Sequence, residues 1–130
     1  MSDFNPNFQA LYIFENIKSE RDKVKVGYTT DSIQNRIQTI NKTYGVFDYL
    51  NDDKNLPIYS WTYRCAYSFS KEACAYTAEQ LTHKYLKEYL DKSAPIGEVF
   101  NCSLRLAVDV VERVIEEKGW EEYVTKLDGW

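Results

Sequence analysis

The chain has 130 residues, a net charge of −4 and 44% hydrophobic residues, and it contains eleven tyrosines. This length predicts one domain with a core of its own, and the aromatic content excludes a disordered chain. No apolar run approaches the roughly 20 residues that cross a bilayer, and the first residues lack the basic and apolar regions of a signal peptide. We therefore expect a single domain over residues 1–130, inside a cell and without membrane contact.

Two neighbouring strands are expected after a loosely held lead over residues 1–8. Residues 9–15 form a short apolar and aromatic run, which is typical of a strand. Residues 23–29, KVKVGYT, alternate in polarity, so Lys25 and Tyr28 fall on opposite faces of a second strand. Together the two segments predict an antiparallel hairpin.

A helix is expected to begin at Asp31, with Gln34 completing a pair that resembles a capping box. Isoleucines at i, i+4 and i+7 form its buried stripe, and Arg36 lies at the edge of that stripe. Arg36 should therefore emerge where this helix meets the sheet. A tyrosine, a lysine and an arginine from these consecutive elements, Tyr12, Lys25 and Arg36, can converge on one phosphate.

The remaining sequence alternates between further strands and helices, which favours an α+β fold with a small antiparallel or mixed sheet. The expected elements are a loop with an acidic tip (43–56), an aromatic third strand (57–69), a helix from about Lys71 to Leu90 capped by Ser70, a short extended piece from Glu98 to Cys102, a helix over 103–117 ended by Gly119, and a C-terminal extension over 119–130 with one further turn.

Glu79 and His83 lie four residues apart on the long expected helix, so they share one face. Apolar residues occupy the same face, and a carboxylate buried among them is costly unless it is paired or binds a metal. Two interpretations are open: a partly exposed Glu–His pair at the rim, or a metal-ligating Glu79 with His83 close by. Tyr12 and Lys25 also have two interpretations each. Tyr12 is either a core tyrosine or a site residue, and Lys25 is either a solvated strand lysine or a site residue.

The three cysteines are scattered and the chain has one histidine, which argues against a zinc site. An odd and widely spaced set fits reduced thiols packed as small apolar groups. The acidic net charge by itself argues against a dedicated nucleic-acid binder.

The order of motifs resembles the GIY-YIG nuclease superfamily, and most closely a phage-associated branch with K-I-G in place of Y-I-G. The matching segments run in order over residues 10–115: ALYIF, KVKVGYTT, Arg36, the Glu79–His83 helix and Glu98-Val99-Phe100-Asn101. The resemblance implies a three-stranded antiparallel sheet flanked by helices. It also implies a bacterial or phage-infected host cell as the setting.

The same resemblance implies hydrolysis of DNA phosphodiester bonds with one divalent metal, Mg²⁺ or Mn²⁺, and RNA is not excluded as a substrate. Tyr12 would help deprotonate the attacking water, Lys25 would assist electrostatically, Arg36 would steady the scissile phosphate and Glu79 would hold the metal. The supporting positions are His83, Asn101, Tyr28 and Glu98, the last with an unclear role. One carboxylate is sufficient, since Mg²⁺ keeps several of its waters in protein sites.

The sequence departs from the family pattern at two places. Ala10 stands at the glycine of the first motif, and residues 48–55 form an acidic insertion that would repel a DNA backbone near the site. An alternative function is therefore a catalytically weak or inactive domain that binds nucleic acid or protein, as a phage accessory or counter-defence factor. A further alternative is an enzyme acting on another phosphate ester. A protein partner or a homodimer is compatible with either function.

Overall fold

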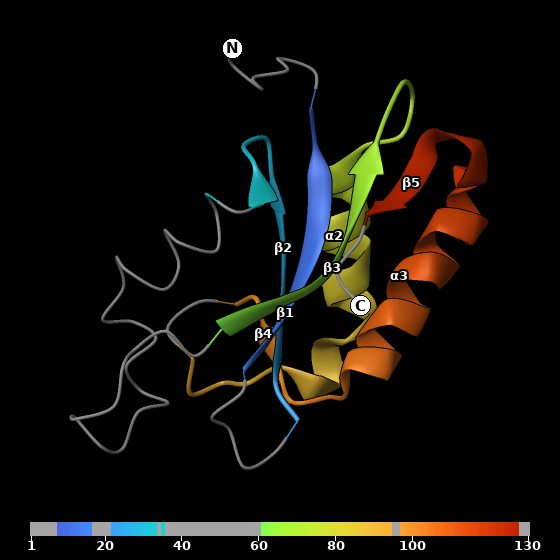
Figure 1. Cartoon of the computed structure of the whole chain (residues 1–130). Helices are drawn as coiled ribbons and strands as arrows, with labels where there is room; N and C mark the ends of the chain where they lie inside the picture. Colours follow the sequence, from blue (N-terminus) through green and yellow to red (C-terminus); the bar gives the residue numbers. More distant parts are fainter. Residues whose placement is uncertain (1–7, 17–21, 34, 36–60, 95–96, 128–130) are drawn as a thin grey trace.

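The computed structural model describes residues 8–16, 22–33, 35, 61–94 and 97–127 of the chain (Figure 1). Within these residues the fold is α+β, as expected. The elements in chain order are β1 (Ala10–Asn16), β2 (Val24–Thr29), β3 (Trp61–Phe69), α2 (Ala75–Tyr85), the 3₁₀ helix η2 (Lys87–Tyr89), β4 (Val99–Phe100), α3 (Leu104–Lys118), the 3₁₀ helix η3 (Glu121–Tyr123) and β5 (Val124–Leu127).

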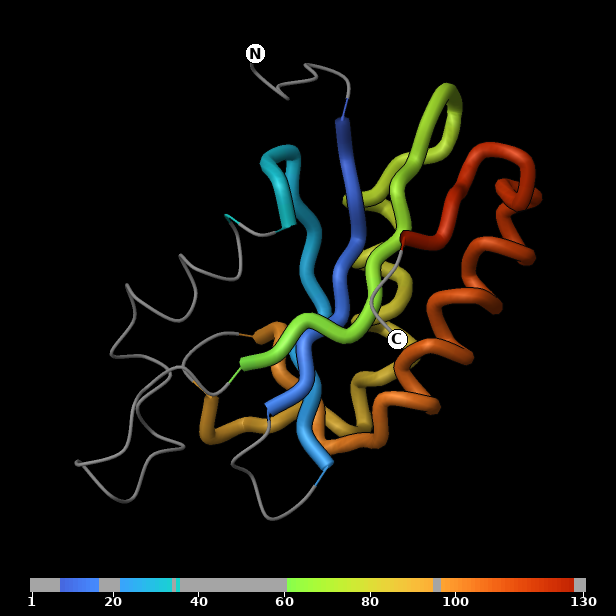
Figure 2. The backbone as a smooth tube through the Cα atoms, viewed as in Figure 1, coloured from blue at the N-terminus to red at the C-terminus, as the bar shows by residue number. Residues whose placement is uncertain are grey.

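The strands form one antiparallel sheet in the order β4-β2-β1-β3-β5. Figure 2 shows β1 running between β2 and β3, which is the three-stranded centre expected from the sequence. The expectation of three strands is nevertheless wrong, because β4 and β5 extend the sheet at its two sides. Each adds hydrogen bonds to backbone groups that would otherwise form an open edge. The C-terminal extension was expected to add only a turn, whereas it forms η3 and then β5.

Alternation along β1 and β2 divides the core between the two faces of the sheet. Leu11 and Val26 face α2 and α3 in the larger cluster of buried apolar residues. Tyr12 and Phe14 face the opposite side, where they belong to a smaller cluster with Trp61. The predicted hairpin is confirmed, and its register pairs Tyr12 with Gly27 and Phe14 with Lys25. Both helices consequently lie on one face, and Lys25 lies on the other.

The long helix begins later than expected, and the prediction of a Ser70 cap is wrong. Lys71 has a left-handed φ of 55°, and the Ser70 hydroxyl donates to the Tyr123 carbonyl oxygen at 3.1 Å. Helix α2 starts after Cys74, and its first amide, from Ala75, donates to the Gln9 side-chain oxygen at 2.7 Å. A distant glutamine therefore satisfies a helix end that a local hydroxyl was expected to cap.

The last helix agrees with the sequence at both ends. The Ser103 hydroxyl accepts a hydrogen bond from the Leu106 amide at 3.1 Å, which makes it the N-cap of α3. Gly119 ends α3 with a left-handed φ of 69°, a conformation that glycine adopts without strain. Near the expected first helix, the Ser32 hydroxyl accepts from the Asn35 amide at 3.1 Å, while the predicted pairing of Asp31 with Gln34 lies outside the described residues.

Several expectations fall outside the described residues. They are the expectations for Gln34, for Arg36 and for the acidic loop, which lie at residue 34 and within 36–60. Most of the N-terminal lead (1–7) and the last three residues of the C-terminal extension (128–130) also lie outside the described residues. Across the described ranges, no helix is both long enough and apolar enough to span a membrane.

Candidate functional site

Tyr12 and Lys25 meet on the face of the sheet that α2 and α3 do not cover. The Lys25 ammonium donates to the Tyr12 phenol oxygen at 2.9 Å and lies 5.0 Å from the centre of the same ring. The Tyr12 side chain is 0% exposed and Lys25 is 1% exposed, so the interpretation of Lys25 as a solvated lysine is wrong. A buried ammonium requires acceptors close by, and Tyr12 is one of them.

Glu98 supplies the opposite charge for Lys25. It lies immediately before β4, which pairs with the start of β2 and so brings the carboxylate to the Lys25 ammonium. The Glu98 carbonyl oxygen also accepts from the Val26 amide at 3.0 Å, which fixes the backbone of Glu98 against β2. At 31% exposure, Glu98 is the most accessible of these three side chains. Tyr12, Lys25 and Glu98 therefore form one connected cluster.

Helix α2 runs alongside β2 and is attached to it at two points. The Tyr76 ring packs edge-on against the Tyr28 ring, with centroids 5.2 Å apart. About two turns further along the same face of α2, His83 Nε2 lies 2.7 Å from the Val26 carbonyl oxygen. Because a carbonyl can only accept, His83 donates from Nε2. Glu79 lies between these two attachments on the same face of the helix, and its carboxylate is thereby held beside β2.

The electrostatics of Glu79 connect it to the cluster. Glu79 is 2% exposed, so the interpretation of a partly exposed rim pair is wrong for this residue. Burial raises its pKa above the ordinary value, and the charge of Glu98 raises it further. His83, the Gln80 side chain, which donates to Glu79 at 2.8 Å, and Lys25 act in the opposite direction. Glu79 is thus a buried carboxylate whose charge is incompletely compensated by the described residues.

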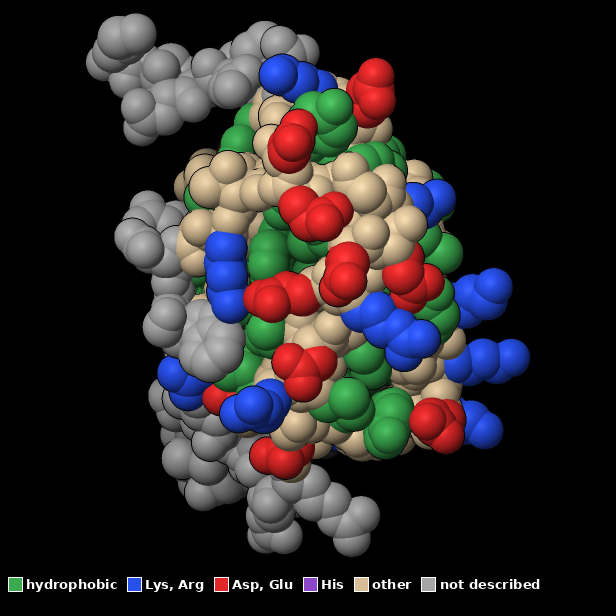
Figure 3. All heavy atoms as spheres, turned by 90° about the vertical axis from the view of Figure 1, so that its right-hand side faces the viewer, with side chains coloured by type: hydrophobic (Ala, Val, Ile, Leu, Met, Phe, Trp, Pro, Cys, Tyr) green, Lys and Arg blue, Asp and Glu red, His purple; other side chains and the backbone are tan. Residues whose placement is uncertain are grey.

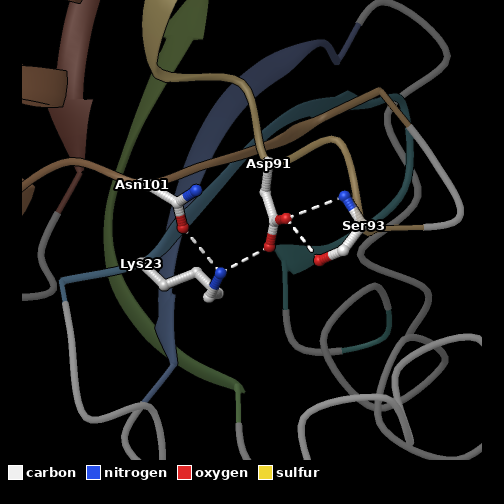
Figure 4. Close-up of polar contacts among 4 residues, drawn as sticks. All are labelled: Lys23, Asp91, Ser93 and Asn101. Carbon is white, nitrogen blue, oxygen red and sulfur yellow. Dashed lines mark hydrogen bonds and ion pairs between the residues drawn. The ribbon is translucent and has the colours of Figure 1, made fainter.

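Asn101 belongs to a polar cluster formed around Lys23. Figure 4 shows its side-chain oxygen accepting from the Lys23 ammonium, at 2.6 Å, while the same ammonium is paired with Asp91. The other Asp91 oxygen accepts from the Ser93 amide at 3.0 Å and from the Ser93 hydroxyl at 2.6 Å. This Lys23 cluster ties the start of β2 to the segments on either side of β4.

Gly27 is a residue of the site that the sequence did not single out. A Cβ built at Gly27 would lie 2.3 Å from the Tyr12 hydroxyl and 3.1 Å from the Lys25 ammonium. Only glycine leaves room for the contact between these two side chains. The available signal was the K-V-G triplet, whose alternation places Gly27 on the Lys25 face. The same alternation placed Lys23 there, although its partners Asp91 and Asn101 could not be read from the sequence.

The cysteines behave as expected from their spacing. All three are free thiols, and Cys65 and Cys102 are buried in the larger apolar cluster. Burial raises the pKa of the Cys102 thiol to about 11, so this group is protonated and unreactive at neutral pH.

A divalent cation of the magnesium type would find oxygen ligands at this site. Among the described residues, no set of three or more His, Cys, Asp or Glu side chains is arranged to hold a metal ion. Mg²⁺ takes only one or two carboxylates and completes its shell with water. Glu79 and Glu98 are two carboxylates that repel one another electrostatically, and a cation would offset both this repulsion and the burial of Glu79. The donor chemistry therefore fits Mg²⁺ or Mn²⁺.

Comparison with known proteins places the chain in a family. The model of the T5orf172 domain matches residues 9–116, which include every described residue of the cluster. No curated protein matches the chain. Because the match covers most of the sequence, the chain belongs to the T5orf172 domain family, a phage-associated family of the nuclease-like type.

Proposed function

We propose that this protein is a metal-dependent endonuclease of the GIY-YIG type that hydrolyses phosphodiester bonds in DNA. The observation that carries the proposal is the convergence of Tyr12, Lys25 and Glu98 from three strands or their ends. Glu79, on α2, is linked to them through the charges of Lys25 and Glu98, which shift its pKa in opposite directions. Membership of a nuclease-like family supports the same function. Phosphodiester hydrolysis requires an activated water, compensation of the phosphate charge and stabilisation of the leaving oxygen.

Each described side chain has a defined role in this proposal. Tyr12 would help to deprotonate the attacking water, and the hydrogen bond that Lys25 donates to its phenol oxygen would hold that oxygen in place. Lys25 compensates the charge that develops on the phosphate, acting as a point charge. Gly27 keeps the contact between these two side chains open. Arg36 lies outside the described residues, and the resemblance to GIY-YIG nucleases assigns it to the scissile phosphate.

Glu79 would hold the metal, with Glu98 as the neighbouring carboxylate. A bound divalent cation supplies positive charge to the phosphate and lowers the cost of forming the leaving oxygen. His83 holds α2 against β2 through the Val26 carbonyl and so keeps Glu79 in place. Tyr28 braces the same helix through its contact with Tyr76.

A second candidate function is supported by the low exposure of the cluster. Tyr12, Lys25 and Glu79 are 0%, 1% and 2% exposed, whereas a substrate phosphate has to reach Tyr12 and Lys25. In addition, Glu98 already occupies the place of an anion at Lys25. These features favour a domain of the same fold that binds nucleic acid or protein without cleaving.

Plasmid nicking separates the two functions. Supercoiled DNA is incubated with the purified protein and either Mg²⁺, Mn²⁺ or EDTA, and Arg36→Ala is compared with wild type. The nuclease proposal predicts metal-dependent nicking that Arg36→Ala abolishes. It is contradicted if the wild type nicks no DNA or RNA tested, or if Arg36→Ala nicks equally well. A stoichiometric protein partner in a pull-down, together with no metal binding, would support the second function.

A further inference from the structure

We propose that three exposed lysines at and after the end of α2 form a surface that binds the phosphate backbone of duplex DNA. These residues, Lys84, Lys87 and Lys92, are called the lysine surface below. The inference rests on the proposed function for the identity of its partner, and it adds a binding surface outside the catalytic cluster.

The lysine surface surrounds an open hollow at the end of α2. The hollow has a volume of about 510 Å³ and is lined by Lys84, Tyr85, Lys87, Glu88, Leu90 and Lys92. All three lysines are exposed, and none forms an ion pair with another described residue. Their ammonium groups are therefore accessible to an external anion.

The charge of this segment is more positive than its sequence suggests. Between Lys84 and Lys92 the acidic residues are Glu88 and Asp91, and the Asp91 carboxylate is buried and paired with Lys23. Within this segment, three exposed lysines thus accompany a single exposed carboxylate, that of Glu88. The Glu117 carboxylate of α3 also reaches the hollow, where it accepts from the Tyr85 hydroxyl, and it is paired with Arg113. Such a local excess of positive charge attracts a polyanion even when the whole chain has a net charge of −4.

The α3 side of the molecule has the opposite character. Acidic residues outnumber basic ones by six to three between Asp109 and Lys126. Figure 3 shows acidic side chains along the middle of this face, with basic ones interspersed. Glu112, Glu116 and Glu121 line a hollow of about 340 Å³ there. Because the lysine surface is positive and the α3 side is negative, a DNA backbone is attracted to the end of α2 and repelled from α3.

The register of the chain connects the lysine surface to the catalytic cluster. The Asp91 amide donates to the Val99 carbonyl oxygen at 2.9 Å, and the Asn101 amide donates to the Tyr89 carbonyl oxygen at 2.7 Å. These bonds form a short antiparallel ribbon around the Leu90–Phe100 bridge. Lys92 and Glu98 follow and precede this ribbon at the same end. A backbone bound along the lysine surface therefore continues towards Glu98 and Lys25.

The chemistry of the surface predicts affinity without sequence preference. Lysines act as flexible point charges on phosphate oxygens, and contacts of this kind position the duplex but carry no base information. Each phosphate that a lysine neutralises releases counterions, so binding weakens as salt increases. The slope of log K against log salt falls by about 0.9 for each such contact on duplex DNA.

The test measures binding of a labelled DNA duplex by fluorescence anisotropy over a salt series without divalent cations, so that cleavage does not occur. The wild type is compared with a triple variant of the lysine surface, Lys84→Ala, Lys87→Ala and Lys92→Ala. A charge-matched control, Arg113→Ala, Lys118→Ala and Lys126→Ala, removes three positive charges from the α3 side. Thermal unfolding of all three proteins verifies that they are folded.

We expect the lysine-surface variant to reduce the magnitude of the salt slope by about 2 to 3. The control should retain the wild-type slope. Equal slopes in the lysine-surface variant and the wild type, or an equal loss in both variants, would overturn the inference. Its failure is distinguishable from that of the nuclease proposal. If the wild type cleaves DNA but the lysine-surface variant keeps the wild-type salt slope, only the inference about the lysine surface is contradicted. If the variant loses salt-dependent binding but the wild type does not cleave, only the nuclease proposal is contradicted.

Discussion

Gly27 and Tyr12 face one another across β2 and β1, and a Cβ at Gly27 would lie 2.3 Å from the Tyr12 hydroxyl. The space left by the missing side chain is where the Tyr12 phenol meets the Lys25 ammonium. The glycine of the second motif is therefore explained by packing against the tyrosine of the first. Two motifs separated in sequence act as one structural unit.

Substitution Gly27→Ala should disrupt this unit. The added methyl group forces the Tyr12 ring or the strand to move, and overpacking of this kind costs about 1–3 kcal/mol of unfolding free energy. Nicking should fall more than tenfold, since the Tyr12–Lys25 contact is displaced. Thermal unfolding and plasmid nicking measure the two effects. Gly97→Ala is the matched control, because nothing lies within 4 Å of a Cβ there; equal behaviour of the two variants would refute this explanation.

Substitution Tyr12→Phe should separate activity from stability. It removes the acceptor of one Lys25 hydrogen bond, whereas Glu98 continues to compensate the ammonium. We expect a loss of unfolding free energy of about 1 kcal/mol, and a loss of nicking of at least about 100-fold, because a proton acceptor is removed. Tyr123→Phe, far from the cluster on η3, serves as the control. Retained nicking in Tyr12→Phe would remove Tyr12 from the mechanism.

Substitution Glu79→Gln should stabilise the protein at neutral pH. The folded-state pKa of Glu79 is raised, chiefly by burial, so the folded state binds more protons than the unfolded state between the two pKa values. The stability contribution of this group falls as pH rises through that window, and it is least favourable above the folded pKa. Urea unfolding should show the variant to be more stable than the wild type at pH 7, by a margin that shrinks towards pH 4. The control, Glu116→Gln on the exposed face of α3, should show neither effect. A margin that grows towards pH 4 would contradict the raised folded-state pKa of Glu79.

Magnesium should stabilise the wild type and not Glu79→Gln. A ligand that binds only the folded state adds about 1.4 kcal/mol at ten times its dissociation constant. Thermal unfolding in a MgCl₂ series should therefore show a rising midpoint for the wild type and a flat one for the variant, with KCl at matched ionic strength as the reference. Parallel curves for both proteins would mean that Glu79 does not hold the metal.

The Lys23 cluster should be a strong structural element. The Lys23 and Asp91 side chains are 10% and 5% exposed, and removing one partner leaves a buried charge uncompensated. Asp91→Ala is expected to cost about 3–5 kcal/mol, and Lys23→Met combined with Asp91→Leu should cost much less than the sum of the single changes. A double-mutant cycle on the exposed pair Arg113–Glu117 should give only about 0.3–0.5 kcal/mol. Additive effects at Lys23 and Asp91 would contradict the coupling.

Part of the meeting of Tyr12 and Lys25 could be predicted from local rules. Period-two alternation assigns Lys25 its face of β2, and two short strands in succession indicate a hairpin. The family resemblance, and not the apolar run of β1, brought Tyr12 to the same site. The position of Glu79 and His83 on one helical face follows from similar local periodicity. Sequence periodicity therefore predicts those contacts of the site that join residues close together in the chain.

The contacts that were not predicted span long stretches of chain. Gln9 satisfies the start of α2 across 66 residues, and this partner replaces the expected local cap at Ser70. Asn101 pairs with Lys23 across 78 residues, and no pattern in the sequence indicated this partner. The polar segment of β5 forms a strand because β3 offers a free edge, and its own sequence does not signal this. Tertiary partners decide these features, and spacing alone does not encode them.

The rate of plasmid nicking as a function of Mg²⁺ concentration, measured for wild type and Glu79→Gln, tests the central claim most directly. We predict that the wild-type rate rises and saturates with Mg²⁺, and that Glu79→Gln loses at least about 100-fold of that rate while remaining folded. Nicking by the wild type in EDTA, or a folded Glu79→Gln variant that nicks at the wild-type rate, would contradict a metal-dependent nuclease site centred on Glu79.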